Sequence, residues 1–172
     1  MTAIIGLDLS LTSTGVASSN GWVTRIKIPP SADKFTRHRK ISNAVMDHCR
    51  DADLVVVEGM SLGTKPQPGL DQRAGLWWLT MEAIDGNDIP WIEVPPSTLK
   101  RYATGVGNAS KDAVLAAAVR RFPAIDVTGN DEADALWLCQ IGADLAGEPM
   151  VDMPAAHRAA LVKLALPEAV AV

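Results

Sequence analysis

The sequence predicts a single α/β domain with a mixed five-stranded sheet and helices on both faces of that sheet. Two observations lead to this class. Three short β-rich segments joined by tight turns come first, and apolar strand-like segments then alternate with segments of helical periodicity. The first three strands should therefore pair antiparallel, and the two later strands should be parallel. We expect one domain over residues 1–172, with its core between about 3 and 146.

The three predicted N-terminal strands form a meander. They occupy residues 3–9, 14–19 and 22–28. Asn20-Gly21 lies between the second and third strands, and this dipeptide favours a type I′ hairpin turn because both central residues need positive φ.

The rest of the chain alternates helices with two further strands. A helix capped by Ser31 or Asp33 should end near Cys49, and its candidate inward residues are Phe35, Ile41, Val45 and Met46. In order, there follow a strand at 53–58, a loop at 61–70, a helix at 71–84, a strand at 89–94, a short helix capped by Ser97 and reaching 102, a Gly-rich loop at 104–109, helices at 110–122 and 130–146, and a last helix at about 154–166.

Composition limits the possible function classes. No apolar run is long enough for a membrane span, and there is no basic, signal-like N-terminal segment. Cys49 and Cys139 form neither a disulfide framework nor a zinc motif, so we expect a reducing, cytoplasmic location, which would be the host cytoplasm if the protein is viral. The net charge of −4 argues mildly against nucleic acid, but basic residues cluster locally at 25–40 and at 100–121.

Two acidic residues end strands that are otherwise apolar. Asp8 lies near the end of the first strand and Glu58 ends the fourth. Burying an ionised carboxylate is costly, and two such groups close together repel each other unless a cation lies between them. Asp8 could alternatively form a turn with the residues after it, whereas Glu58 would cap nothing.

Asp131 and Asp134 lie three residues apart at the start of a predicted helix and therefore on one face. They could simply cap that helix and favour its positive end. Together with Asp8 and Glu58 they could instead form a four-carboxylate cluster. Such a cluster can hold two divalent metal ions for phosphodiester hydrolysis. The adjacent Glu132 is a further candidate ligand, but neighbouring helix positions rarely face the same way, so it is interpreted as solvent-facing or as a cap.

The motifs GLDLSLTSTGVA, LVVVEG and GNDEADALWL, in this order, resemble the acidic motifs of the RuvC Holliday-junction resolvases. The segment LKRYATGVGNASKDAV resembles the lysine-containing loop of that family. The resemblance covers residues from about 3 to 146. It implies an RNase H-like fold, a Mg²⁺- or Mn²⁺-dependent crossover junction endodeoxyribonuclease with about two ions per site, a homodimer, and cleavage of four-way DNA junctions.

The resemblance also assigns roles to individual residues. Asp8, Glu58, Asp131 and Asp134 correspond to the metal ligands. Lys100 and Lys111 correspond to phosphate-contacting or transition-state-stabilising groups, with Lys111 in the catalytic set, although isolated lysines are usually solvated surface residues. The further candidates for DNA binding are Arg37, Arg39, Lys40, Arg101 and Ser61.

One position departs from the family pattern. The family has an aromatic residue three positions after the second acid, where this chain has Ser61. Loss of stacking there predicts a broader preference for branched DNA. The adjacent Trp77 and Trp78 cannot both face one core, so one is a candidate interface residue.

Other functions remain open at this point. The turn after Asp8 also resembles the phosphate loop of actin-like ATPases, but the chain is too short for two nucleotide-clamping lobes, so no nucleotide cofactor is expected. A non-catalytic nucleic-acid-binding module and a nuclease for hybrid or flap substrates are the remaining alternatives.

Overall fold

A five-stranded mixed sheet forms the centre of the protein, in the strand order β3-β2-β1-β4-β5. The computed structural model describes residues 2–30, 33–60 and 68–170. The strands are β1 (Ile4–Asp8), β2 (Thr14–Ser18), β3 (Trp22–Ile26), β4 (Leu54–Glu58) and β5 (Trp91–Val94). β1, β2 and β3 pair antiparallel, whereas β4 pairs parallel with both β1 and β5. The predicted fold class is therefore confirmed.

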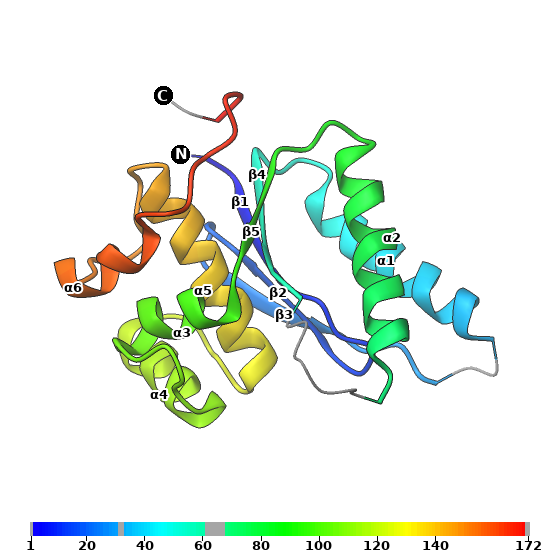
Figure 1. Cartoon of the computed structure of the whole chain (residues 1–172), viewed down its shortest axis with the longest axis horizontal. Helices are drawn as coiled ribbons and strands as arrows, with labels where there is room; N and C mark the ends of the chain where they lie inside the picture. The colour runs from blue at the N-terminus through cyan, green and yellow to red at the C-terminus, as the bar shows by residue number, and fades with distance from the viewer. Residues whose placement is uncertain (1, 31–32, 61–67, 171–172) are drawn as a thin grey trace.

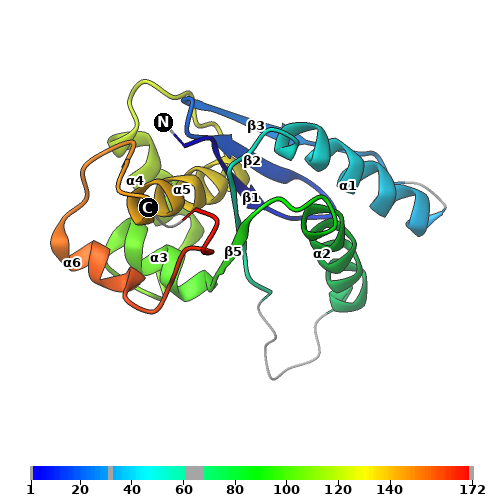
Figure 2. The ribbon, with the colours of Figure 1, turned by 90° about the horizontal axis from the view of Figure 1, so that it is seen from above.

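Helices cover both faces of this sheet, as predicted (Figure 1). Within the described residues they are α1 (Lys34–Cys49), α2 (Leu70–Asp85), α3 (Pro96–Thr104), α4 (Lys111–Arg121), α5 (Asn130–Leu145) and α6 (Ala155–Arg158), followed by the 3₁₀ turn Ala159–Leu161. Seen from above, α1 and α2 lie on one side of the sheet, and α3, α4 and α5 lie on the other (Figure 2).

The alternation of side chains along the strands produces two separate cores. In β4, Val55 and Val57 face the core under α1 and α2, while Leu54 and Val56 face the core under α5. A strand that is apolar on both faces needs cover on both, which is why the run in β4 predicted a central parallel strand. This arrangement fixes which way the last residue of the strand, Glu58, can point.

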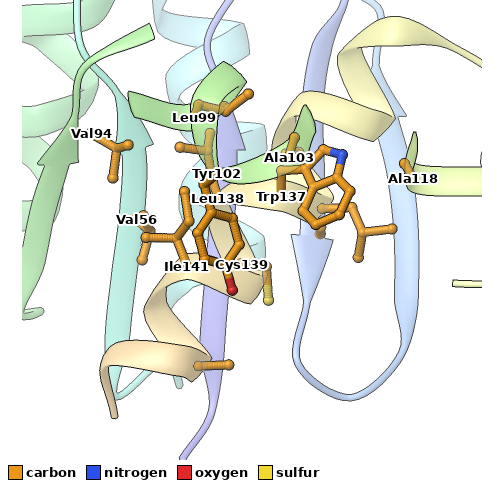
Figure 3. Close-up of a cluster of buried hydrophobic side chains, with 14 of the residues drawn as sticks. Val56, Val94, Leu99, Tyr102, Ala103, Ala118, Trp137, Leu138, Cys139 and Ile141 are labelled. Atoms are coloured by element: carbon orange, nitrogen blue, oxygen red, sulfur yellow. The ribbon is translucent and has the colours of Figure 1, made fainter. Parts of the chain in front are cut away.

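Helix α5 is the most deeply buried helix of the described chain. Its Trp137 is fully buried and makes an edge-to-face contact with Tyr102 of α3 (Figure 3). A second such contact joins Trp137 to Phe122, which follows α4. The Trp137 indole N–H donates to the backbone carbonyl of Val114 over 3.2 Å, so the buried donor is satisfied. This packing joins α3, α4 and α5 into one layer.

Close backbone contact sets α5 directly on β1 and β2. A Cβ atom at Gly6 would overlap the carbonyl oxygen of Ala135, and one at Gly15 would overlap the carbonyl oxygen of Asp131. Because only glycine leaves this space open, these two positions determine how close the first turns of α5 come to the sheet.

Several details of the predicted elements were wrong. Phe35 is 64% exposed instead of inward-facing, because α1 turns Ile41 and Val45 to the core. Ser97 does not cap α3, which begins at Pro96, where the fixed φ of proline suits the first helical turn. The last helix, α6, is much shorter than the predicted residues 154–166. The hairpin between β2 and β3 is not a type I′ turn, because Ser18 pairs with Trp22 across three residues and, of these three, only Gly21 has a positive φ.

Other details agree with the prediction or lie outside the described part of the chain. Asp33 caps α1 by accepting hydrogen bonds from the backbone N–H groups of Phe35 and Thr36. The alternative cap, Ser31, falls outside the described residues. Among the described residues, no helix is both long and apolar enough to cross a membrane.

Candidate active site

Asp8 and Glu58 end two neighbouring parallel strands at the same edge of the sheet. Leu7 of β1 and Val57 of β4 are register partners, so the next residue of each strand is the acid. Asp8 is only 8% exposed. The expectation that these two strands are adjacent and bring their acids together is therefore confirmed.

Helix α5 brings two more carboxylates to this edge. Asp131 and Asp134 lie in its first turns, where Gly15 lets the helix backbone approach β2. Asp134 is buried and Asp131 is half-buried. The position of the helix start over the sheet explains the burial, which capping alone would not require.

The pKa values of three of these acids show that they affect one another. Burial, followed by repulsion from Glu58 and Asp134, raises the pKa of Asp8 well above its usual value. Burial and repulsion from Asp134 raise the pKa of Glu58 to about 7. Burial first, and then Asp131, raise the pKa of Asp134 to about 6. Buried like charges of this kind are typical of a functional site or of a site for a cation.

Two lysines oppose this repulsion. Lys111, the first residue of α4, lowers the pKa values of Asp8, Glu58 and Asp134, and Lys100 of α3 lowers those of Glu58 and Asp134. The structure thus places both predicted lysines near the acids although they come from different helices. Their charge offsets only part of the effect of burial, because the three pKa values remain raised.

The donor set has the chemistry of a site for a hard divalent cation. Carboxylate oxygens are the ligands that Mg²⁺ and Mn²⁺ prefer, and a bound cation would relieve the repulsion that raises these pKa values. In the described residues, no three His, Cys, Asp or Glu side chains converge closely enough to hold a metal ion together. Asp8, Glu58, Asp131 and Asp134 match such an ion by type and charge, and they are the residues that could hold it.

A small cavity opens beside Asp8 and Glu58. Its volume is about 140 Å³, and its other lining residues are Leu9, Gly59, Met60, Leu70, Arg73 and Trp77. Trp77 and Arg73 were not predicted for this site. Their signal in the sequence is the helical spacing of positions 70, 73 and 77, which places these side chains on one face of α2.

The other predicted basic residues have different surroundings. Arg37 donates from Nη2 to the carbonyl oxygen of Leu11 over 2.6 Å, which ties α1 to the turn after β1. Arg39 and Lys40 are exposed on α1, and Arg101 is exposed on α3. Ser61 lies outside the described residues.

The interpretation of Glu132 as solvent-facing or as a helix cap was wrong in its first part. Glu132 is only 7% exposed, although it neighbours two acids that face the sheet edge. It forms an ion pair with Arg25 of β3, with 3.0 Å between Nε and Oε1. Sequence spacing could not show this, since the partner lies more than a hundred residues earlier in the chain.

The fold is similar to solved structures of Holliday-junction resolvases. A structure of Thermus thermophilus RuvC superposes with a TM-score of 0.62 and 16% identity, covering 86% of this chain and 98% of that one. The chain has the RuvC fold. T. thermophilus RuvC in complex with a Holliday junction substrate gives a TM-score of 0.60 at 18% identity, with 81% of this chain and 91% of that chain covered.

A third similar structure comes from yeast. The yeast mitochondrial Holliday junction resolvase gives a TM-score of 0.50 at 14% identity, with coverage of 80% of this chain and 76% of that chain. The sequence matches no protein-family model and no curated protein. The likeness to the RuvC fold is thus clear in the three-dimensional structure although the sequence identity is only 14–18%.

Proposed function

We propose that this protein is a Mg²⁺- or Mn²⁺-dependent endonuclease that cleaves branched DNA, with four-way junctions as the preferred substrate. The observation that carries the proposal is a group of three mutually repelling carboxylates, the buried Asp8 and Asp134 and the half-buried Glu58, with Lys111 nearby. Burial of uncompensated acids destabilises a fold, so the group is best explained by a cationic partner.

Each residue of the site has a distinct part in the proposed reaction. Asp8, Glu58, Asp131 and Asp134 would hold the cations, about two per site, and these would lower the pKa of the attacking water and stabilise the leaving oxygen. Lys111 would stabilise the negative charge that develops on the scissile phosphate.

The basic residues around the site would hold the DNA backbone. Lys100 also faces the acids and would contact a phosphate next to the scissile one. Arg101 and Lys40 are exposed and would bind phosphates farther along the arms. Arg39 is also exposed, but it lines the groove between α1 and α2. Arg37 would contribute mainly by holding the turn at Leu11 in place, because its Nη2 already donates a hydrogen bond to the Leu11 carbonyl oxygen.

We propose that the protein acts as a homodimer through the exposed face of α1 and α2. Trp78 is 66% exposed and Phe35 is 64% exposed, and large exposed aromatics favour an interface. Between the two helices lies a groove of about 310 Å³. Its apolar lining comes from residues such as Phe35 and Leu79, and polar side chains that include Arg39 and Asp71 border it. A second copy on this face would supply the second active site that paired cleavage of a four-way junction needs.

A substrate panel tests the proposed function. Labelled four-way junction, linear duplex, flap DNA and an RNA–DNA hybrid are incubated with Mg²⁺ and either the wild-type protein or Asp8→Asn. We expect paired nicks in the junction from the wild type and none from the variant. Cleavage that persists in Asp8→Asn would overturn the mechanism. Preferential cleavage of hybrid or flap would overturn the substrate assignment, and a junction that is bound but never cut would favour a non-catalytic module.

A further inference from the structure

Glu132 lies between Asp131 and Asp134 in the chain, but it is engaged on the opposite side of the first turn of α5. Both of its carboxylate oxygens have partners. Oε1 lies 3.0 Å from Nε of Arg25. Oε2 accepts from the backbone N–H of Thr128 at 2.7 Å and from the Thr128 hydroxyl at 2.9 Å. Because adjacent helix positions point about 100° apart, Glu132 is not placed to join its neighbours at the sheet edge.

Arg25 holds this turn from the sheet. It lies on β3, directly opposite Gly15 of β2. The carbonyl group of Asp131 packs closely against this glycine. Its Nη2 donates to the Thr128 hydroxyl over 3.0 Å, while Nε faces Glu132. The planar guanidinium group therefore contacts both the loop before α5, through Thr128, and the helix itself, through Glu132.

Gly129, at the start of the helix, makes room for this arginine. A Cβ atom at Gly129 would lie 3.1 Å from Nη1 of Arg25, closer than most real contacts of that kind. We call the unit formed by Arg25, Thr128, Gly129 and Glu132 the α5 clasp. It connects the edge strand β3 to the turn that carries two of the four candidate ligands.

We propose that the α5 clasp positions Asp131 and Asp134 for cation binding, and that Arg25 and Glu132 are positioning residues of the active site. This inference rests on the proposed function. Hydrogen-bonding partners that orient metal ligands typically change metal affinity by about 10–100-fold when they are removed. The clasp would act on the helix backbone that carries the ligands, without touching the ion.

The burial of the clasp separates it from an ordinary surface ion pair. The side chains of Arg25 and Glu132 are 31% and 9% exposed. The Arg50–Asp47 pair has the same 3.0 Å separation, but its side chains are 69% and 67% exposed. Exposed pairs contribute little to structure, so Arg50 offers a matched control for Arg25.

Arg25→Met tests the proposal because charge and position predict opposite results. The substitution removes a positive charge near an acidic site, so charge alone would strengthen cation binding. Loss of positioning would weaken it. We expect Arg25→Met to bind Mn²⁺ about tenfold or more weakly than wild type, by titration followed with electron paramagnetic resonance, and Arg50→Met to bind as wild type does.

Two further variants distinguish loss of positioning from simple misfolding: Arg25→Lys, and the double variant in which Arg25 and Glu132 are exchanged. Lysine keeps the charge but cannot bond both Glu132 and Thr128 as the guanidinium fork does, so an intermediate loss of affinity is expected. Arg25→Glu combined with Glu132→Arg should recover part of the affinity lost in Arg25→Glu alone. Circular dichroism of each variant establishes that the fold is kept.

Hydrogen exchange gives a readout without metal. Amides in the segment 128–134 should exchange faster in Arg25→Met than in Arg50→Met, while the rest of α5 stays protected. Unchanged or tighter Mn²⁺ binding by Arg25→Met, beside a wild type that binds Mn²⁺, overturns the clasp and leaves the proposed function standing. A wild type that binds no Mn²⁺ overturns both proposals.

Discussion

Trp77 donates its indole N–H to the backbone carbonyl group of Glu58 over 3.1 Å. The bond joins α2 to the last residue of β4, and the same indole lines the cavity beside Asp8. Helix α2, on one face of the sheet, thereby helps to set the position of Glu58.

Trp77→Phe tests this bond, because phenylalanine keeps much of the apolar contact and removes the donor. We expect the free energy of unfolding to fall by about 1–2 kcal/mol and kcat for junction cleavage to fall more than KM changes. Trp91→Phe is the matched control, since the Trp91 indole donates to the carboxylate of Asp85, which is exposed to solvent. Equal kinetic effects in the two variants would contradict a positioning role for Trp77.

The raised pKa of Glu58 predicts how stability depends on pH. Its folded-state pKa of about 7 lies above the ordinary 4.5, so the folded protein keeps a proton that the unfolded chain releases. This contribution to stability is complete below pH 4.5 and is lost as the pH rises to about 7. With a chelator present, Glu58→Gln should therefore raise the thermal midpoint by several degrees at pH 8, and by less at pH 5.

The magnitude of this effect follows from the size of the shift. The rise in pKa corresponds to at most roughly 3 kcal/mol at pH values above 7. Glu82→Gln is the control, since Glu82 is exposed on α2. A Glu58→Gln protein that is no more stable than wild type at pH 8 would show that the carboxylate is not strained by its surroundings.

Lys111→Met should separate catalysis from cation binding. Lys111 is exposed at the start of α4 and lowers the pKa values of three acids of the site. Without it we expect the cleavage rate to fall by about 10²–10³, with Mn²⁺ affinity kept or increased because a positive charge is gone. Lys163→Met, at an exposed position outside the site, should cut at the wild-type rate. Equal rates in both variants would make Lys111 an ordinary surface lysine.

Trp78→Ser should convert the proposed dimer into a monomer. The indole is 66% exposed on α2, so its loss should cost the folded monomer little. Sedimentation velocity across a concentration series measures the change. Val119→Ser, at a 50% exposed position on α4, is the control and should remain dimeric. A dimer that survives Trp78→Ser would place the interface elsewhere.

Local sequence patterns were enough to predict three antiparallel strands followed by two parallel ones, the covered central strand β4, and the acids that end β1 and β4. The continuous apolar run of β4 and the Asn20-Gly21 dipeptide are local signals for a covered strand and for a hairpin, and both features are present. The type of the hairpin turn was not determined in this way, since of these two residues only Gly21 has a positive φ. The site acids could be named for a similar reason, because a carboxylate such as Glu58 in an apolar strand has few explanations.

The surroundings of those acids follow from contacts between elements that are distant in the sequence. The Arg25–Glu132 pair and the Trp77–Glu58 bond join residues on different elements, and no periodicity in the chain encodes such contacts. Phe35 illustrates the same point. It is apolar, but the packing of α1 against α2 leaves it exposed. Local patterns specify the elements, whereas the close approach of α5 to β2 specifies the site.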